Sequence, residues 1–442
     1  MDNLTHTLIS VLVGEAVHRT LPPSVVLSDR ARRGMAITVM AVGGNLPDAD
    51  VIYTGWAGTT LDYLLHHRGH THTVVGALGL SLLLFGAVWL WWLRRKVKPA
   101  AADVGFLAGV SVLAPLLHIG LDFTNSYGVH PFWPLDDSWF YGDAVFIVEP
   151  LLWACSAALL FVLPGRTARV LIGLVLTAGV VLSWFSGFVP ATLAGLLTLL
   201  TAGLAALSRF APAKVALAGG IATWLALTAT FVITSRTAES RIEALLADRF
   251  PGFSTLDVVL TPMPADPVCR EVLAVQRSTD TYAVRRAFHS LAPGWIPAAR
   301  CAELYPSTGT NTEPGTGAEA GTNTEAGTGA EAATGTAANT TAQLTPVAQP
   351  SDDEIRWAGE LAIPAGLLAT LSSEYCAVGA LLQFARAPWA IPKGDGWIVG
   401  DLRYDHEPGL GMAEVEAGPG RDECPRLPAP WTPPRADLLT GE

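Results

Sequence analysis

Four histidines and one arginine lie within seven residues of the chain, at 66–72, where the sequence is His-His-Arg-Gly-His-Thr-His. Imidazole is the commonest side-chain ligand of zinc and related metals, and a lipid-facing helix has no need of four. Ionisable residues also end two nearby apolar runs, with Asp48 and Asp50 upstream and His118 and Asp122 downstream. This pattern predicts a metal site at the ends of apolar segments.

These residue types suit a divalent metal, zinc first and Mn or Fe as alternatives, bound as one ion or two. Such a metal lowers the pKa of a bound water to about 7. His118 and Asp122 are spaced i, i+4 and so share a helix face. The predicted metal ligands are His6, Asp48, Asp50, His70, His118 and Asp122. His67 and His72 are predicted to act as acid and base or to orient the ligands, and Arg68 to stabilise developing charge.

The composition is that of a membrane protein, because 50% of the 442 residues are hydrophobic and only 15% are charged. Soluble proteins carry about 25% charged residues. Since roughly 20 apolar residues span a bilayer, we expect spans at 34–53, 73–93, 104–122, 146–164, 169–188, 189–207 and 214–234. The segment 8–27 contains Glu15, His18 and Arg19, and either spans or forms a re-entrant or interfacial helix. The expected fold for residues 1–234 is an all-α multi-pass membrane domain of about seven or eight helices.

The distribution of basic residues predicts how this domain is oriented. Basic loops lie at 30–33, 94–98, 166–169 and 209–214. The positive-inside rule places them in the cytoplasm, which puts 54–72, 123–145 and everything after Ser235 outside. The candidate ligands then converge at the outer membrane boundary. From Ser235 onward the chain has 15 basic and 27 acidic residues, a net charge of −12, so no nucleic-acid partner is expected.

The tail is predicted to be a small soluble domain, α+β or β-rich, made of residues 235–306 and 343–442. A low-complexity repeat at 307–342 interrupts it and is predicted to be disordered, because its composition cannot bury a core. Strands are expected at 256–260, 272–275 and 397–404. Four tail cysteines, Cys269, Cys301, Cys376 and Cys424, allow two disulfides in an oxidising compartment, with three possible pairings. Cys155 lies inside a predicted span and is expected to be a packed apolar residue.

Several ordered motifs in residues 1–150 resemble a known family. They are Asp-Asn-Leu-Thr-His-Thr-Leu at 2–8, Leu-Pro-Asp-Ala-Asp at 46–50, His-Arg-Gly-His-Thr-His-Thr at 67–73 and His-Ile-Gly-Leu-Asp at 118–122. They resemble the bacterial membrane-bound metal-dependent hydrolases, also described as YdjM-like, LexA-binding, inner-membrane-associated hydrolases. The resemblance implies a bacterial inner-membrane location and hydrolase activity. The functional positions it implies are His6, Asp48, Asp50, His67, His70, His72, His118 and Asp122. LexA binding needs a cytoplasmic surface and is not carried over, because the predicted topology puts the tail outside.

Taken together, these features predict metal-activated water attacking an ester or phosphoester at the membrane surface. The position of the site favours a lipid or lipid-linked envelope substrate and makes membrane lipids the expected partners. One alternative is a transporter or metal-handling protein that uses the same cluster. Against it, the polar residues gather at one boundary, whereas transporters bind near the midplane. The other alternative is a membrane protein whose tail binds a protein partner, whose identity the sequence does not give.

Overall fold

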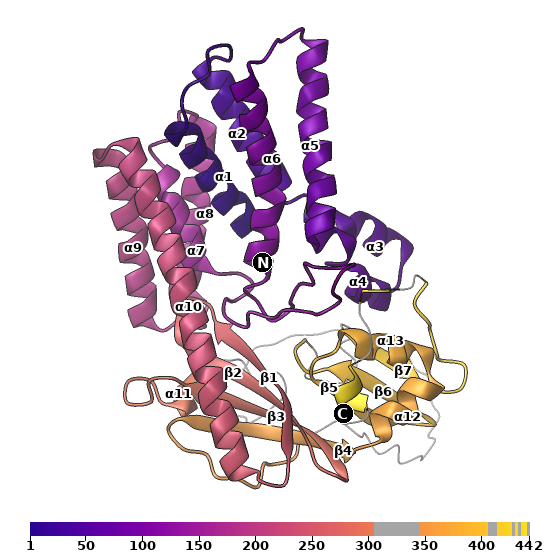
Figure 1. Ribbon diagram of the computed structural model, residues 1–442. Coiled ribbons are helices and arrows are strands. Elements are labelled where there is room, and N and C mark those ends of the chain that lie inside the picture. The colour runs from indigo at the N-terminus through magenta and orange to yellow at the C-terminus, as the bar shows by residue number, and fades with distance from the viewer. Residues whose placement is uncertain (305–343, 405–412, 427–428, 432–434, 440–442) are drawn as a thin grey trace, which may run out of the picture.

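The computed structural model describes residues 1–304, 344–404, 413–426, 429–431 and 435–439. A helical bundle is followed by a smaller part with two β-sheets, called here the sheet domain (Figure 1). The predicted repeat at 307–342 lies outside the described residues.

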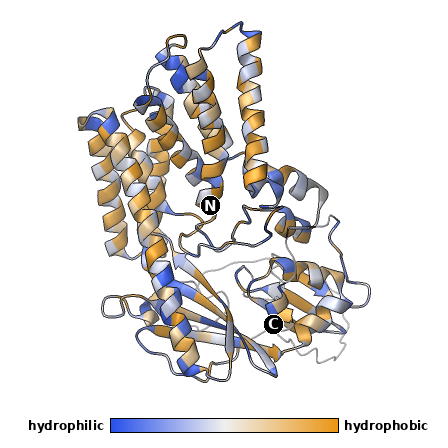
Figure 2. Ribbon diagram, viewed as in Figure 1, coloured by the Kyte–Doolittle hydropathy of each residue, from blue (hydrophilic) through white to orange (hydrophobic). Residues whose placement is uncertain are grey.

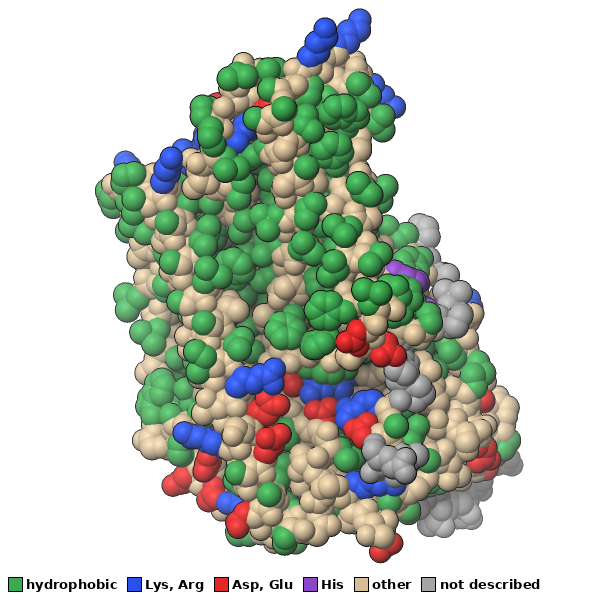
Figure 3. All heavy atoms as spheres, viewed as in Figure 1, with side chains coloured by type: hydrophobic (Ala, Val, Ile, Leu, Met, Phe, Trp, Pro, Cys, Tyr) green, Lys and Arg blue, Asp and Glu red, His purple; other side chains and the backbone are tan. Residues whose placement is uncertain are grey.

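Five helices in the described chain are long and apolar enough to cross a membrane. They are α5 (Val74–Arg94), α6 (Ala101–Asp122), α8 (Arg166–Phe185), α9 (Ala191–Phe210) and α10 (Ala213–Arg249). Figure 2 shows hydrophobic residues along these helices, and Figure 3 shows apolar side chains covering the bundle. They correspond to the spans expected at 73–93, 104–122, 169–188, 189–207 and 214–234. The predicted total of seven or eight spans is not confirmed.

The remaining expected spans are shorter in the structure, for identifiable reasons. Helix α2 (Asp29–Gly43) ends at Gly43, because Pro47 begins a separate short helix, η1 (Pro47–Asp50). Within 146–164, only α7 (Pro150–Cys155) and η3 (Ser156–Leu159) are helical. Helix α1 (Asn3–Thr20) carries a buried Glu15, whose carboxylate pairs with Arg19 at 2.6 Å and Arg33 at 3.3 Å. Helix α1 therefore packs inside the bundle with its charges paired.

A set of short helices links α2 to α5 and carries the histidine-rich segment. Helices α3 (Val51–Ala57) and α4 (Thr60–His66) are followed by η2 (His70–His72). Thr59 and Asp62 form a capping box that starts α4. Thr73 caps α5 by accepting a hydrogen bond from the Gly76 backbone N–H. The histidines therefore lie in a tight connection between two capped helices.

Helix α10 joins the bundle to the sheet domain without a break over 37 residues. Its last turns bury Ile242 and Leu246 in a core shared with Val258 and Val272 of the first sheet. That sheet is antiparallel, in the order β1 (Ser254–Met263), β2 (Asp266–Arg277), β3 (Thr281–Ser290) and β4 (Ile355–Pro364). Helix α11 (Ala298–Leu304) follows β3 and packs against it.

A second antiparallel sheet completes the domain, in the order β5 (Pro388–Lys393), β6 (Gly396–Asp401) and β7 (Glu414–Ala417). Helices α12 (Leu367–Glu374), α13 (Cys376–Phe384) and α14 (Ala436–Leu439) accompany it. The expected strands at 256–260, 272–275 and 397–404 fall on β1, β2 and β6, although β6 ends at Asp401. A small sheet-containing C-terminal domain is thus confirmed.

The four tail cysteines form two disulfides. Cys269 of β2 is bonded to Cys301 of α11, and Cys376 at the start of α13 is bonded to Cys424. Cys155 is a buried free thiol in α7. This is one of the three pairings that the sequence allows, and each disulfide closes a loop within the sheet domain.

The sheet domain contacts the loop 123–149 and the helices that precede α5. The Arg386 guanidinium pairs with Asp143 at 2.8 Å, and Arg403 donates a hydrogen bond to the Ser126 carbonyl at 3.0 Å. Trp431 is buried and donates from Nε1 to the Leu65 carbonyl at 2.8 Å. The sheet domain therefore holds the segment that carries the histidines.

Candidate metal centre

Four side chains from three elements converge on one point at the end of the bundle that faces the sheet domain. They are Asp48 of η1, His72 of η2, and His118 and Asp122 of α6, and one ligand atom from each lies within 4.8 Å of the others. His72 Nε2 lies 3.1 Å from Asp122 Oδ2 and 3.4 Å from Asp48 Oδ1. His118 Nε2 lies 3.3 Å from Asp122 Oδ2 and 3.4 Å from Asp48 Oδ1. This set is called the metal group below.

The hydrogen bonds around the two imidazoles fix which ring nitrogens carry protons. His118 Nδ1 lies 2.7 Å from the Gly44 carbonyl, which can only accept, so Nδ1 carries the proton. Thr71 Oγ1 donates to Asp50 Oδ2 at 3.0 Å and can therefore accept from His72 Nδ1, which is 3.0 Å away. With these protons on Nδ1, neutral imidazoles would present both Nε2 lone pairs to the metal group.

These two lone pairs face each other at a separation of 3.0 Å, between two carboxylates. Four acceptors in one buried place repel one another unless a cation lies among them. Two imidazoles and two carboxylates are ligands typical of zinc and of other first-row divalent metals. The donor set therefore fits a divalent metal ion.

Asp50 supports the metal group from behind. Its buried carboxylate lies 3.0 Å from His67 Nδ1 and accepts the Arg68 backbone N–H at 3.0 Å and the Thr71 hydroxyl at 3.0 Å. Burial alone would raise the pKa of Asp50, but the contacts with His67 and Arg68 outweigh it and the pKa is lowered. The ionised carboxylate thereby fixes the connection that carries His72.

Arg68 is buried, and both terminal nitrogens of its guanidinium make polar contacts. Its backbone has a φ of 64°, a left-handed conformation that turns the chain sharply after α4. Its guanidinium lies 3.0 Å from Asp122 Oδ1 and donates to Asn125 Oδ1 at 3.1 Å and to the Gly128 carbonyl at 3.0 Å. Arg68 therefore balances the charge of Asp122 and leaves the other carboxylate oxygen to the histidines.

His6 joins the same place from α1. Its Nε2 lies 3.3 Å from Asp122 Oδ1, and its ring stacks on His118 with centroids 3.7 Å apart. Both of its ring nitrogens are buried without a hydrogen-bond partner. The amino group of Met1 contacts the same oxygen of Asp122. An unpartnered buried imidazole beside the metal group is a further candidate ligand.

Residues 1–190 match the YdjM inner membrane protein family. The match confirms the resemblance predicted from the motifs, and this range, the YdjM part of the chain, contains the whole metal group. A curated relative, "Uncharacterized protein YfhP" of Bacillus subtilis (strain 168), is 26% identical over 158 residues, which cover 36% of this chain and 45% of the Bacillus protein. The match thus spans less than half of that relative. No solved structure matches this chain.

Within the YdjM part, the structure separates the predicted site residues into three positions. Asp48, His72, His118 and Asp122 form the metal group, and His6 lies against it. Asp50, His67 and Arg68 surround it through hydrogen bonds and ion pairs. His70 is exposed and outside it, with its ring against Trp133 at 5.2 Å and Trp431 at 4.3 Å.

Several supporting residues are not evident from sequence. Gly44 contributes a backbone carbonyl, Asn125 an amide, and Thr71 a hydroxyl that relays a hydrogen bond. His130 is buried and its Nε2 lies 2.7 Å from the Arg68 carbonyl. The one sequence signal for Thr71 is its position inside the segment His-Arg-Gly-His-Thr-His at 67–72. Glu149 lies outside the metal group, where it caps α7 and accepts the Ala265 backbone N–H at 3.1 Å.

The metal group is accessible on one side. Side chains of Asp48 and His67 are each 15% exposed, whereas His72, His118 and Asp122 are buried. His67 has its Nδ1 on Asp50, and its ring centroid lies 5.7 Å from that of His72. Asp48 and His67 are therefore partly open to solvent, whereas the other three side chains are not.

Proposed function

We propose that this protein is a membrane-embedded metal-dependent hydrolase that cleaves an ester or phosphoester at the membrane surface. The observation that carries the proposal is the convergence of two imidazole Nε2 atoms and two carboxylates in the metal group. A divalent metal held there, zinc first, would polarise the scissile group and lower the pKa of a water. The metal would be held by Asp48, His72, His118 and Asp122. His6 is a further candidate ligand.

His67 is the residue placed to move a proton. Its Nδ1 lies 3.0 Å from Asp50 Oδ1, and with the proton on Nδ1 its Nε2 would be the proton acceptor. A carboxylate behind an imidazole is the arrangement that general bases use to hold one tautomer and one orientation. Arg68 acts differently from the sequence-based expectation in this proposal, because its guanidinium neutralises Asp122 and anchors the loop 123–149.

Apolar side chains next to the metal group support an amphiphilic substrate. Val51 and Ile52 follow Asp50 directly and are exposed, and Val74 and Val75 follow η2 and are also exposed. An acyl chain can lie along such residues while the ester or phosphate reaches Asp48. A lipid or lipid-linked envelope molecule is therefore the substrate class we propose.

The orientation in the proposal is multi-pass in the bacterial inner membrane, with the sheet domain extracytoplasmic. The basic loop that follows α5 lies at the end of the bundle opposite the sheet domain (Figure 1), which fits the positive-inside rule. Two disulfides in the sheet domain fit an oxidising compartment.

The test is metal content by inductively coupled plasma mass spectrometry on the detergent-purified full chain. Wild type should hold one or two equivalents of a divalent metal, and His72→Ala and Asp122→Asn should lose it. His70→Ala is the matched control, because His70 lies two residues from His72 but outside the metal group. No metal in wild type after add-back would end the proposal.

Hydrolysis is measured separately, with chromogenic ester and phosphodiester probes in micelles. The proposal expects turnover that chelator abolishes and added metal restores. Bound metal without turnover on either class would favour the metal-handling alternative, which the burial of His72, His118 and Asp122 also suits.

A further inference from the structure

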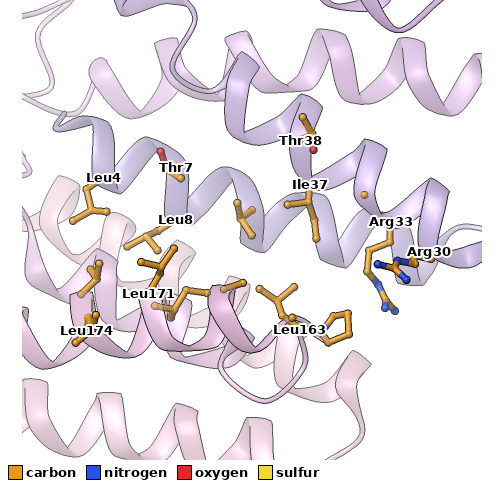
Figure 4. Close-up of a pocket in the computed structure, with 17 residues that line it drawn as sticks. Leu4, Thr7, Leu8, Arg30, Arg33, Ile37, Thr38, Leu163, Leu171 and Leu174 are labelled. Carbon is orange, nitrogen blue, oxygen red and sulfur yellow. The ribbon is translucent and has the colours of Figure 1, made fainter. Parts of the chain in front are cut away.

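A long groove runs along the bundle between α1, α2 and α8, from Leu4 at the start of α1 to Arg30 and Arg33 near the start of α2. Its volume is about 1100 Å³, and its walls are mainly apolar, with Leu8 of α1, Ile37 of α2 and Leu171 of α8 among them. Figure 4 shows these side chains facing one another along the groove, with two arginines at one end. The walls offer few polar groups, which suits hydrocarbon.

A second groove of about 590 Å³ lies on the other side of α2, against Val88 and Trp91 of α5. The two grooves share Arg30, Gly34 and Thr38, which are spaced four residues apart and so form one stripe along α2. A Cβ built on Gly34 meets nothing within 4 Å. This stripe, called the saddle, therefore separates the two apolar grooves and has no side chain at Gly34.

Two arginines lie at the end of this saddle, and they differ in whether a carboxylate pairs with them. Arg33 is held by Glu15 Oε2 at 3.3 Å and by Asp29 Oδ2 at 3.5 Å. Arg30 is exposed, and within the described part of the chain no carboxylate pairs with it. Arg30 lies in the first turn of α2, close to Arg33, which pairs with Glu15 near the end of α1. His6, beside the metal group, lies in the first turn of α1. Arg30 therefore lies at the opposite end of the bundle from the metal group.

We propose that this saddle binds an anionic diacyl phospholipid, with one acyl chain in each groove and its phosphate on the Arg30 guanidinium. Two apolar channels that meet at a glycine match two chains that meet at a glycerol. Basic pockets between membrane helices on the cytoplasmic side are a known way to bind anionic headgroups. The site is independent of the hydrolase proposal, because its phosphate end lies far from the metal group.

The experiment is lipid titration of the full chain by native mass spectrometry, with phosphatidylglycerol and phosphatidylcholine of identical acyl chains. Wild type should prefer phosphatidylglycerol, and Arg30→Gln should weaken that lipid about fivefold and weaken phosphatidylcholine less, because choline offsets the charge of its phosphate. Gly34→Leu should weaken both lipids, since its side chain fills the saddle. Single-chain lysophosphatidylglycerol should bind less tightly than the diacyl lipid.

The matched controls make the same changes elsewhere. Arg94→Gln removes an arginine from the same end of the bundle, and Gly86→Leu fills a position on α5 that also has nothing within 4 Å. Melting temperatures of all variants check that they fold. Equal affinity of wild type and Arg30→Gln for phosphatidylglycerol overturns the headgroup assignment. Equal losses in the variants and their controls mean adventitious boundary lipid only.

Discussion

Replacing Asp50 with asparagine tests the division between residues that bind metal and residues that move protons. Asp50 Oδ2 accepts the Arg68 backbone N–H and the Thr71 hydroxyl, and Oδ1 lies beside His67 Nδ1. The asparagine side chain has the same shape, and its amide oxygen can keep the two contacts at one position. Its NH₂ group then faces His67 Nδ1, which must accept instead of donate. The His67 proton moves to Nε2, where a general base needs a lone pair.

The magnitude follows from counting these contacts. One of three hydrogen bonds to the carboxylate is lost or inverted, and a bond to a charged group contributes about 1.5–3 kcal/mol. Changes of this kind behind a metal ligand lower metal affinity about 10–100-fold. Loss of general acid–base catalysis lowers the rate by about 10²–10⁴. The rate at saturating metal should therefore fall while the metal stoichiometry is kept.

The assay has two readouts on the same preparation. Zinc affinity is measured by competition with a chromophoric chelator, and the rate with a chromogenic phosphodiester at saturating zinc. His67→Ala should match Asp50→Asn in rate, and Asp136→Asn, in the exposed loop, should match wild type. A wild-type rate in Asp50→Asn would refute the role given to His67. Complete loss of zinc would make Asp50 a ligand instead of a support.

Three further predictions concern the sheet domain and its contact with the bundle. Burial raises the pKa of Glu149 to about 8. The folded state then binds more protons than the unfolded state, so stability falls as pH rises from about 4.5 to about 8; a Glu149→Gln variant should lose this pH dependence in thermal melts. Trp431→Ala removes a buried ring packed on His70, costs about 3–5 kcal/mol, and should expose the histidine connection to limited proteolysis. Cys269→Ser should cost about 2–5 kcal/mol, because the disulfide with Cys301 spans 32 residues of sequence, and should lower the denaturant midpoint of the sheet domain.

Helical periodicity made part of the site predictable from sequence. His118 and Asp122 are four residues apart on a long apolar helix, so that their common face follows from helix geometry alone. The HRGHTH segment offers no such rule. The positive φ of Arg68 turns the chain, and as a result His72 lies in the metal group while His70 lies against Trp431. That partner comes from the far end of the chain, and no local pattern indicates it.

The membrane helices show the same limit. The apolar runs of α5, α6, α8, α9 and α10 were readable because length and hydropathy define a span. The runs at 34–53 and 146–164 are also apolar but are interrupted by proline and by short helical turns. Whether an apolar run spans a bilayer or packs inside a bundle depends on its neighbours, which composition does not describe.

The unbroken helix α10 has a mechanical consequence. Its 37 residues make a rod about 55 Å long at 1.5 Å per residue, and the hydrocarbon core of a bilayer takes up only about 30 Å. If α10 crosses the bilayer, the part of it outside the hydrocarbon core would hold the sheet domain away from the lipid surface. In the function proposed above, a substrate would then reach Asp48 and His67 from the side, within the layer of lipid headgroups. Such a protein would act on molecules that diffuse in the plane of the membrane, and not on molecules in the surrounding medium.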